Sequence, residues 1–235
     1  MRLTGRLLGA VLTLSVCLLI LSAVIYAAGT DQRLMLHLMR VDAPPESTGL
    51  PASQYAGMAE MITAYLTDRT DTFQYILDMD GQGTWILFHD YEQAHMQDCK
   101  ALFQLDMRIL ITSAGMTAVL VTMLSLLHVW RAALSGARIG CLMVFGVLGC
   151  LVLWGCLDFS GLFITFHRLA FSNGLWILNP QTDLLIRLMP TAFFVHYVLL
   201  IAGAFLLATG VYTFAVCRME RVIMRPQERR VYDKR

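Results

Sequence analysis

Charged residues are scarce in this chain of 235 residues. They make up 15% of the sequence, whereas hydrophobic residues make up 57%, and the formal net charge is only +1. This composition is atypical of a soluble domain with a solvated surface and is typical of an integral membrane protein. Because a charge near zero says little by itself, the distribution of Lys and Arg along the chain carries the topological information.

Several signatures of enzymes are also missing. There is no Gly-x-Ser-x-Gly for a serine nucleophile, no His-Glu-x-x-His or Cys-x-x-Cys for zinc, and no ATP site. Most of the six cysteines lie in or beside apolar runs, so no disulfide framework is visible. We expect no metal and no cofactor. One alternative stays open: Glu92, His95 and Cys99 share a helix, and with His167 they would form the metal site of a membrane hydrolase.

Four apolar runs are long enough to cross a bilayer: 7–28, 109–130, 139–157 and 193–216. In lipid the backbone must satisfy its own hydrogen bonds, so each run is expected to be a helix. The first run is longer than the apolar core of a cleaved signal peptide, so it is interpreted as a permanent anchor. The sequence therefore predicts an all-α integral membrane protein that forms a single membrane domain over 1–235.

Lys and Arg predict the orientation. They are concentrated at the N-terminus, between the second and third spans, and in the tail 218–235. Those parts are expected to be cytoplasmic, and so are both termini. The segments 29–108 and 158–192 are then extracytoplasmic and are expected to form a small, mostly helical cap.

Turn and cap residues predict local structure in these outer segments. The expected features are a helix from Ser53 as N-cap to about Asp68, a helical turn over 73–79, a turn over 80–83, a capping box of Asp90 with Gln93, and a helix over 181–189 that starts at Asn179-Pro180. No Gly or Pro interrupts 90–114, so the helix that begins at Asp90 is expected to continue into the second span.

Two histidines dominate the functional prediction. His95 precedes the second span and His167 follows the third, so the topology places both at the outer boundary. Imidazole exchanges protons near neutral pH, which suggests acid–base chemistry on a lipid-linked substrate. Asp98, one helical turn from His95, is expected to orient that ring. The competing interpretation is a pair of ordinary interfacial histidines, as is expected of His37, His89 and His128.

The residues around both histidines resemble the bacterial lipoprotein intramolecular transacylases. The first stretch resembles the family's Glu-x-x-His-Met-x-Asp-Val-Lys, with Cys99 in place of Val. The second resembles Phe-His-x-x-x-Phe followed by Trp, Pro, Asp and Pro, with Thr191 where an acidic residue is expected. The matching residues are Glu92, His95, Met96, Asp98, Lys100, Phe166, His167, Phe171, Trp176, Pro180, Asp183 and Pro190.

This resemblance implies an acyltransferase. The sn-2 acyl chain of a diacylglyceryl lipoprotein would move to the α-amino group of its N-terminal cysteine, giving the lyso-form lipoprotein. His95 and His167 would be catalytic, one as base and the other as acid, in an order that the sequence leaves open. The expected supporting or substrate-binding residues are Glu92, Asp98, Arg168, Asn173, Trp176 and Asp183.

The expected partners are lipoproteins and membrane lipid, with no nucleic acid. The chain is expected to be a monomer in the bacterial cell membrane, with its active site at the outer leaflet. An alternative from a different functional class is that the protein is a non-enzymatic binding subunit or a small transporter. The spans contain almost no ionisable side chains to line a path, which argues against transport.

Overall fold

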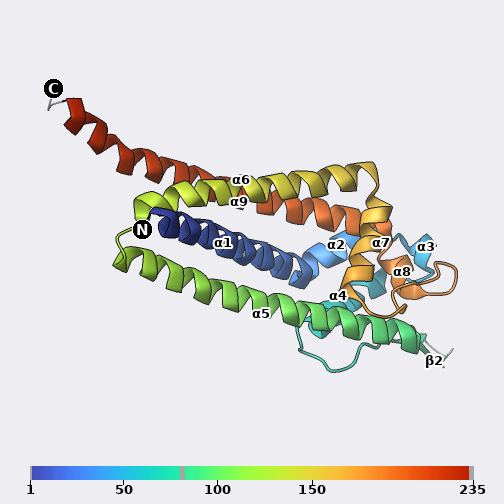
Figure 1. Cartoon of the computed structure of the whole chain (residues 1–235). Helices are drawn as coiled ribbons and strands as arrows, with labels where there is room; N and C mark the ends of the chain where they lie inside the picture. Colours follow the sequence, from blue (N-terminus) through green and yellow to red (C-terminus); the bar gives the residue numbers. More distant parts are fainter. Residues whose placement is uncertain (1, 80–82, 233–235) are drawn as a thin grey trace. The chain divides into compact units, whose positions relative to one another are not determined.

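The computed structural model describes residues 2–79 and 83–232. In this part of the chain, helices predominate and a short hairpin is the exception (Figure 1). The elements are α1 (Arg2–Thr30), α2 (Gln32–Asp42), α3 (Pro45–Thr48), the 3-10 turn η1 (Ala52–Gln54), α4 (Tyr55–Leu66), β1 (Ile76–Met79), β2 (Gly83–Ile86), α5 (Asp90–Leu126), α6 (Trp130–Leu157), α7 (Phe159–Ala170), α8 (Leu184–Leu188) and α9 (Thr191–Tyr232).

Four of the described helices are long and apolar enough to cross a membrane: α1, α5, α6 and the Thr191–Ile223 part of α9. The predicted all-α membrane architecture is therefore confirmed. The predicted second span, 109–130, however, extends past the end of its helix. The α5 helix ends at Leu126, and α6 begins at Trp130, with His128 between them at a φ of 53°. A positive φ cannot continue a right-handed helix, so the chain turns there.

The contacts divide the chain into two compact units. Unit 1 comprises residues 1–24, 108–154 and 202–235, and unit 2 comprises residues 25–107 and 155–201.

Within unit 1, α1 contacts the three other long helices. A Cβ atom added at Gly9 or at Gly136 would lie only 1.9 Å from a backbone oxygen of the other helix, so α1 and α6 touch backbone to backbone. Small residues permit such close approach in membrane bundles. The hydroxyl of Ser15 donates to the carbonyl of Ser113 on α5 (3.0 Å), and Thr13 shares a hydrogen bond with Tyr212 on α9 (3.0 Å).

Unit 2 has its own hydrophobic core. It is built mainly from α2, α4 and α8, together with the first turns of α5 and α9. Its most deeply buried side chains include Met39, Tyr55, Met58, Ile62 and Leu188, each of which is 0% exposed. Both histidines of the predicted site belong to this unit, so its packing fixes their surroundings.

Two local predictions in unit 2 were wrong. Ser53 is not an N-cap, because it lies inside η1, and α4 starts at Tyr55 without a side-chain cap. The segment 76–79 is a strand and not a helical turn, because it pairs antiparallel with 83–86 in the register Ile76 to Ile86. Leu77 is buried while Ile76 is 60% exposed, which is the alternation of a strand. The predicted turn over 80–83 falls largely on residues outside the described ranges.

The predicted helix over 181–189 is also shorter than expected. Asn179 does not cap a helix. Its side chain accepts from the N–H of Gln181 in a tight turn, and α8 begins only at Leu184. An Asx side chain can close such a turn as readily as it caps a helix. The end of α8 before Pro190 agrees with the prediction.

Candidate active site

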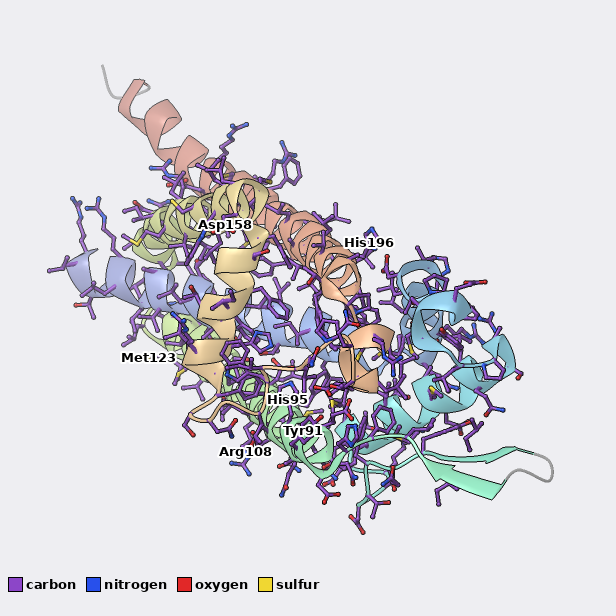
Figure 2. The ribbon with its side chains drawn as sticks, turned by 90° about the vertical axis from the view of Figure 1, so that its right-hand side faces the viewer. Tyr91, His95, Arg108, Met123, Asp158 and His196 are labelled. Carbon is purple, nitrogen blue, oxygen red and sulfur yellow. The ribbon has the colours of Figure 1, made fainter. Side chains whose placement is uncertain are left out.

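The two predicted histidines lie side by side in unit 2. His95 projects from α5, as does Tyr91 (Figure 2), while His167 lies on the last turn of α7. Their ring centroids are 6.3 Å apart. His95 is 8% exposed and His167 is 7% exposed. The fold thus brings two distant imidazoles into one buried pair.

His167 has a defined tautomer. Its Nδ1–H donates to the backbone carbonyl of Phe163, one turn earlier on α7, at 2.8 Å. Because a carbonyl oxygen can only accept, Nδ1 carries the ring proton, and in the neutral ring Nε2 has a free lone pair. The rings of Phe163, Phe171 and Trp176 surround the imidazole at centroid distances of 4.1, 5.5 and 5.1 Å. The side chain is therefore held both by a hydrogen bond and by aromatic packing.

His95 has a different environment. Its Nε2 lies 3.7 Å from the Sγ of Cys99, which is one turn further along α5. Its Nδ1 is buried and has no hydrogen-bond partner among the described residues. The ring also packs edge to face on Phe171, at 5.1 Å. A buried polar atom without a partner is costly and therefore needs an explanation, such as a catalytic role.

Both imidazoles are held in the neutral form, and both lie outside the predicted spans 109–130 and 139–157. Burial lowers the pKa of His95 to about 4; His167 lowers it as well, and Asp98 raises it by less. Burial also lowers the pKa of His167 and outweighs the raising effect of its bond to Phe163. At neutral pH each ring can therefore accept a proton.

This neutral pair predicts a pH-dependent stability. An unfolded histidine gains a proton below its ordinary pKa of about 6.5, whereas the folded His95 does not until about pH 4. The contribution of neutral His95 to the free energy of unfolding is then fully present above about pH 6.5. It decreases as the pH falls towards 4, by up to about 3 kcal/mol. The thermal midpoint in detergent, measured from pH 8 to pH 4.5, should fall less steeply in His95→Gln than in the wild type.

The exposed His37 provides the control. His37→Gln removes one histidine without changing the buried pair, so its midpoint should follow the wild-type pH dependence. If the thermal midpoint fell equally at acid pH in wild type and His95→Gln, His95 would not be the group that titrates.

Asp98 does not orient His95 through a hydrogen bond, contrary to the prediction. Its Oδ2 instead accepts from the Nδ2–H of Asn173, 75 residues away, at 2.8 Å. Asp98 acts on His95 only through its charge, which raises the pKa of that ring. A carboxylate one turn away shares the same side of the helix, but the nearest donor is an amide from the loop after α7.

Glu92 is completely buried, and its carboxylate accepts hydrogen bonds from the backbone. One oxygen accepts from the N–H of His89 (2.7 Å), and the other accepts from the N–H of Leu185 (2.8 Å). The capping box of α5 therefore uses Glu92, one residue earlier than the predicted Gln93. Since the same carboxylate also binds an N–H in the first turn of α8, Glu92 joins two helix starts.

Asp183 is also engaged within the protein. It is 2% exposed and accepts from the hydroxyls of Tyr91 and Thr182 and from the N–H of Asn179. Burial tends to raise the pKa of Asp183, but these hydrogen bonds outweigh it and lower the pKa. Asp183 thus fixes the turn before α8 to α5.

The remaining candidates differ in their surroundings. Trp176 packs on His167, and its indole N–H donates to the carbonyl of Asn173 (3.0 Å). Arg168 is exposed and forms no ion pair with a described residue. His196, which is not among the predicted site residues, pairs with Asp42 (2.9 Å). Within the described ranges, no group of three or more His, Cys, Asp and Glu side chains is placed to hold a metal ion.

A polar pocket of about 620 Å³ lies on the other side of α5. Its lining includes Asp68, Lys100 and Gln104, with Lys100 and Asp68 forming an ion pair of 2.6 Å. On a helix, positions 100 and 104 point roughly opposite to position 95. This pocket is therefore not where the two imidazoles would meet a substrate.

Sequence reasoning missed three features of the site. The contact between Cys99 and His95 was considered only as part of a metal site. The aromatic partner Phe163 and the link from Asn173 to Asp98 were not predicted. The spacing of Phe163 and His167, one helical turn apart, is a signal that predicts their contact, whereas no local pattern indicates a hydrogen bond between α5 and a loop 75 residues away.

Comparisons with known proteins agree with this architecture. A solved structure of the membrane-integral lipoprotein intramolecular transacylase from Bacillus cereus is similar, with a TM-score of 0.76 and 17% identity over 96% of this chain and 99% of the other. Two further structures of that protein have one histidine replaced, and both are 17% identical to this chain over 94% of its length. The arginine variant gives a TM-score of 0.67 with 95% of its own chain covered, and the alanine variant gives 0.69 with 96% covered. No curated protein matches.

The family assignment comes from the sequence match. The family model described as lipoprotein intramolecular transacylase matches residues 9–194, which is most of the chain and includes both histidines. This chain therefore belongs to the lipoprotein intramolecular transacylase family, a family of membrane-integral transferases that act on lipoproteins.

Proposed function

We propose that this protein moves the sn-2 acyl chain of a diacylglyceryl lipoprotein to the α-amino group of the lipoprotein's N-terminal cysteine. The observation that carries the proposal is the buried pair of neutral imidazoles, 6.3 Å apart, on a chain of this family. Such a pair suits a reaction that needs proton transfer at two atoms of one substrate.

The reaction is balanced within one molecule. The amine nitrogen attacks the ester carbonyl carbon, and the bond from that carbon to the glyceryl oxygen breaks. The nitrogen loses one proton, and the glyceryl oxygen gains one, so the products are an amide and an alcohol of unchanged total mass. Because the donor and acceptor are tethered, the protein has mainly to orient them and to move protons. An ester is converted to a more stable amide, so no external energy source is required.

The tautomer of His167 supports its assignment as the base. With Nδ1 donating to Phe163, the lone pair of Nε2 is free to take the proton of the attacking amine. The faces of the surrounding aromatic rings would offset part of the cost that burial imposes on the imidazolium that forms.

His95 is then assigned as the ring whose N–H donates a hydrogen bond to the reacting oxygen. The proton that His167 takes from the amine passes on to the glyceryl oxygen, so that both rings end neutral. Burial raises the pKa of the Cys99 thiol to about 12, so the thiol keeps its proton and can donate to Nε2 of His95. In that arrangement Nδ1 carries the ring proton and lacks a partner, and the glyceryl or carbonyl oxygen of the substrate would supply one.

The proposed setting is the outer leaflet of the bacterial cell membrane, with a monomer as the active form. The orientation is supported by the Lys and Arg near both termini, which favour a cytoplasmic location for the chain ends. The exposed Arg168, beside His167, is proposed to contact substrate or lipid headgroups.

Mass spectrometry of the product tests the proposed function. The purified protein is incubated with a synthetic diacylglyceryl lipopeptide that has a free N-terminal cysteine. We expect a product of unchanged mass whose fragments carry an acyl chain on the amine and one remaining O-acyl chain. A product that has lost an acyl chain to water would indicate a hydrolase, and an unchanged lipopeptide would contradict the proposed reaction.

A further inference from the structure

The short segment 171–176, named here the cover segment, packs on both imidazoles. The ring of Phe171 lies 5.1 Å from that of His95 and 5.5 Å from that of His167. Trp176, at the other end, lies 5.1 Å from His167. Both imidazoles are more than nine-tenths buried. The cover segment therefore places aromatic side chains against both imidazoles and helps to bury the histidine pair.

One asparagine connects the cover segment to α5. The Nδ2–H of Asn173 donates to Asp98 (2.8 Å), while its Oδ1 accepts from the N–H of Leu175 (3.0 Å). Its backbone carbonyl accepts from the indole of Trp176 (3.0 Å). The exposed Asn173 thus ties the loop to the same helix that carries His95, only one turn away.

We propose that the hydrogen bond between Asp98 and Asn173 holds the cover segment closed over the histidines, and that this closure decides whether the amine or water receives the acyl chain. The inference rests on the proposed function and adds a determinant of its outcome. Asp98 and Asn173 are positioning residues, because they act through Phe171 and Trp176 and not on the substrate.

The competing reaction is hydrolysis. If water attacks the same ester carbonyl carbon, the bond to the glyceryl oxygen breaks, one water proton goes to that oxygen, and a free fatty acid is released. The same base can activate either nucleophile, so the histidines alone do not choose between them. Exclusion of water by a closed segment would make that choice.

The test exchanges the two partners. Asn173→Asp places two carboxylates opposite each other, which should open the cover segment. The double variant Asp98→Asn with Asn173→Asp restores one amide and one carboxylate in reversed positions. Gln104→Glu adds the same charge on the opposite face of α5 and is the matched control. The measured quantity is the ratio of released fatty acid to N-acylated lipopeptide, by mass spectrometry.

We expect this ratio to rise about tenfold in Asn173→Asp, as the loss of a charge-assisted hydrogen bond implies. It should return close to the wild-type value in the exchanged double variant and stay at that value in Gln104→Glu. Asp98→Asn alone leaves a neutral amide–amide hydrogen bond in place of the charge-assisted one, so the ratio should rise by less than in Asn173→Asp. The same variant removes the charge that raises the pKa of His95, so it should also change the pH dependence of transfer.

The two proposals fail in different ways. An unchanged ratio in Asn173→Asp, in a preparation that still transfers the acyl chain, would overturn the role of the cover segment and leave the transfer reaction intact. A raised ratio that the exchange does not restore would also overturn it, because the effect would then come from charge and not from the hydrogen bond. Loss of the proposed function itself would appear as no transfer in the wild type.

Discussion

Removing either imidazole is expected to lower the rate of acyl transfer by about 10²- to 10⁴-fold, which is the usual contribution of a general acid or base. The expectation applies to His95→Ala and to His167→Ala. The two rings lie 6.3 Å apart and are proposed to serve one proton-transfer sequence. The double variant should therefore be little worse than either single variant, since residues that act as a unit are not additive.

His167→Asn is the sharper variant of the base. An Asn side chain can still donate to the carbonyl of Phe163, as Nδ1 does, but it offers no basic nitrogen in place of Nε2. We expect it to keep the thermal midpoint closer to wild type than His167→Ala does while transfer is lost. The rate is measured by mass spectrometry of the lipopeptide product.

The exposed His37 serves as the control for histidine loss, and His37→Ala should transfer at the wild-type rate. Near-normal transfer by folded His95→Ala or His167→Ala would contradict the two-histidine mechanism. Equal losses of transfer and of folded protein in every variant would mean that the histidines serve packing alone.

Glu92→Ala is expected to destabilise the fold by about 3–5 kcal/mol, because it removes the fully buried carboxylate that accepts from one buried and one part-buried N–H group. Each orphaned donor loses a charge-assisted hydrogen bond, and the N–H of Leu185 stays away from water. The substitution also releases the first turn of α8 from that of α5. A large decrease in the thermal midpoint in detergent, together with a lower yield of folded protein, should result.

Two further variants separate this structural role from a role on the substrate. Glu92→Gln keeps one acceptor oxygen and should give an intermediate decrease. Asp90→Ala removes an exposed acidic residue from the same helix turn and should cost only about 0.3–1 kcal/mol through the helix dipole. If Glu92→Ala kept the wild-type midpoint but lost transfer, the carboxylate would act on the substrate after all.

The sequence by itself determined the membrane architecture, and it predicted the two histidines that the fold brings side by side. Length and apolarity suffice to identify the four long helices, because a backbone in lipid has no alternative to internal hydrogen bonds. The motifs around His95 and His167 indicated the family that the family model then confirmed. The uninterrupted helix from Asp90 into the second span was likewise predictable, since no Gly or Pro breaks it.

Local patterns were less reliable at the short elements. The segment 76–79 was predicted as helical, yet it is a strand because a partner strand pairs with it. The capping box at the start of α5 was displaced by one residue, since Glu92 was free to turn back to His89 while also meeting α8. A short apolar run or a cap pattern fits several structures, and the neighbour that packs on it selects one.

Only the tertiary structure decided how the side chains of the site are connected. The sequence placed Asp98 one turn from His95, which made a bond between them the simplest expectation. In the folded protein Asn173 reaches Asp98 from a loop 75 residues away, and Cys99 takes the position beside Nε2 of His95. Periodicity specifies which side of a helix a residue occupies, but the partner on that side comes from another part of the chain, and its hydrogen-bond donors and acceptors fix the final pairing.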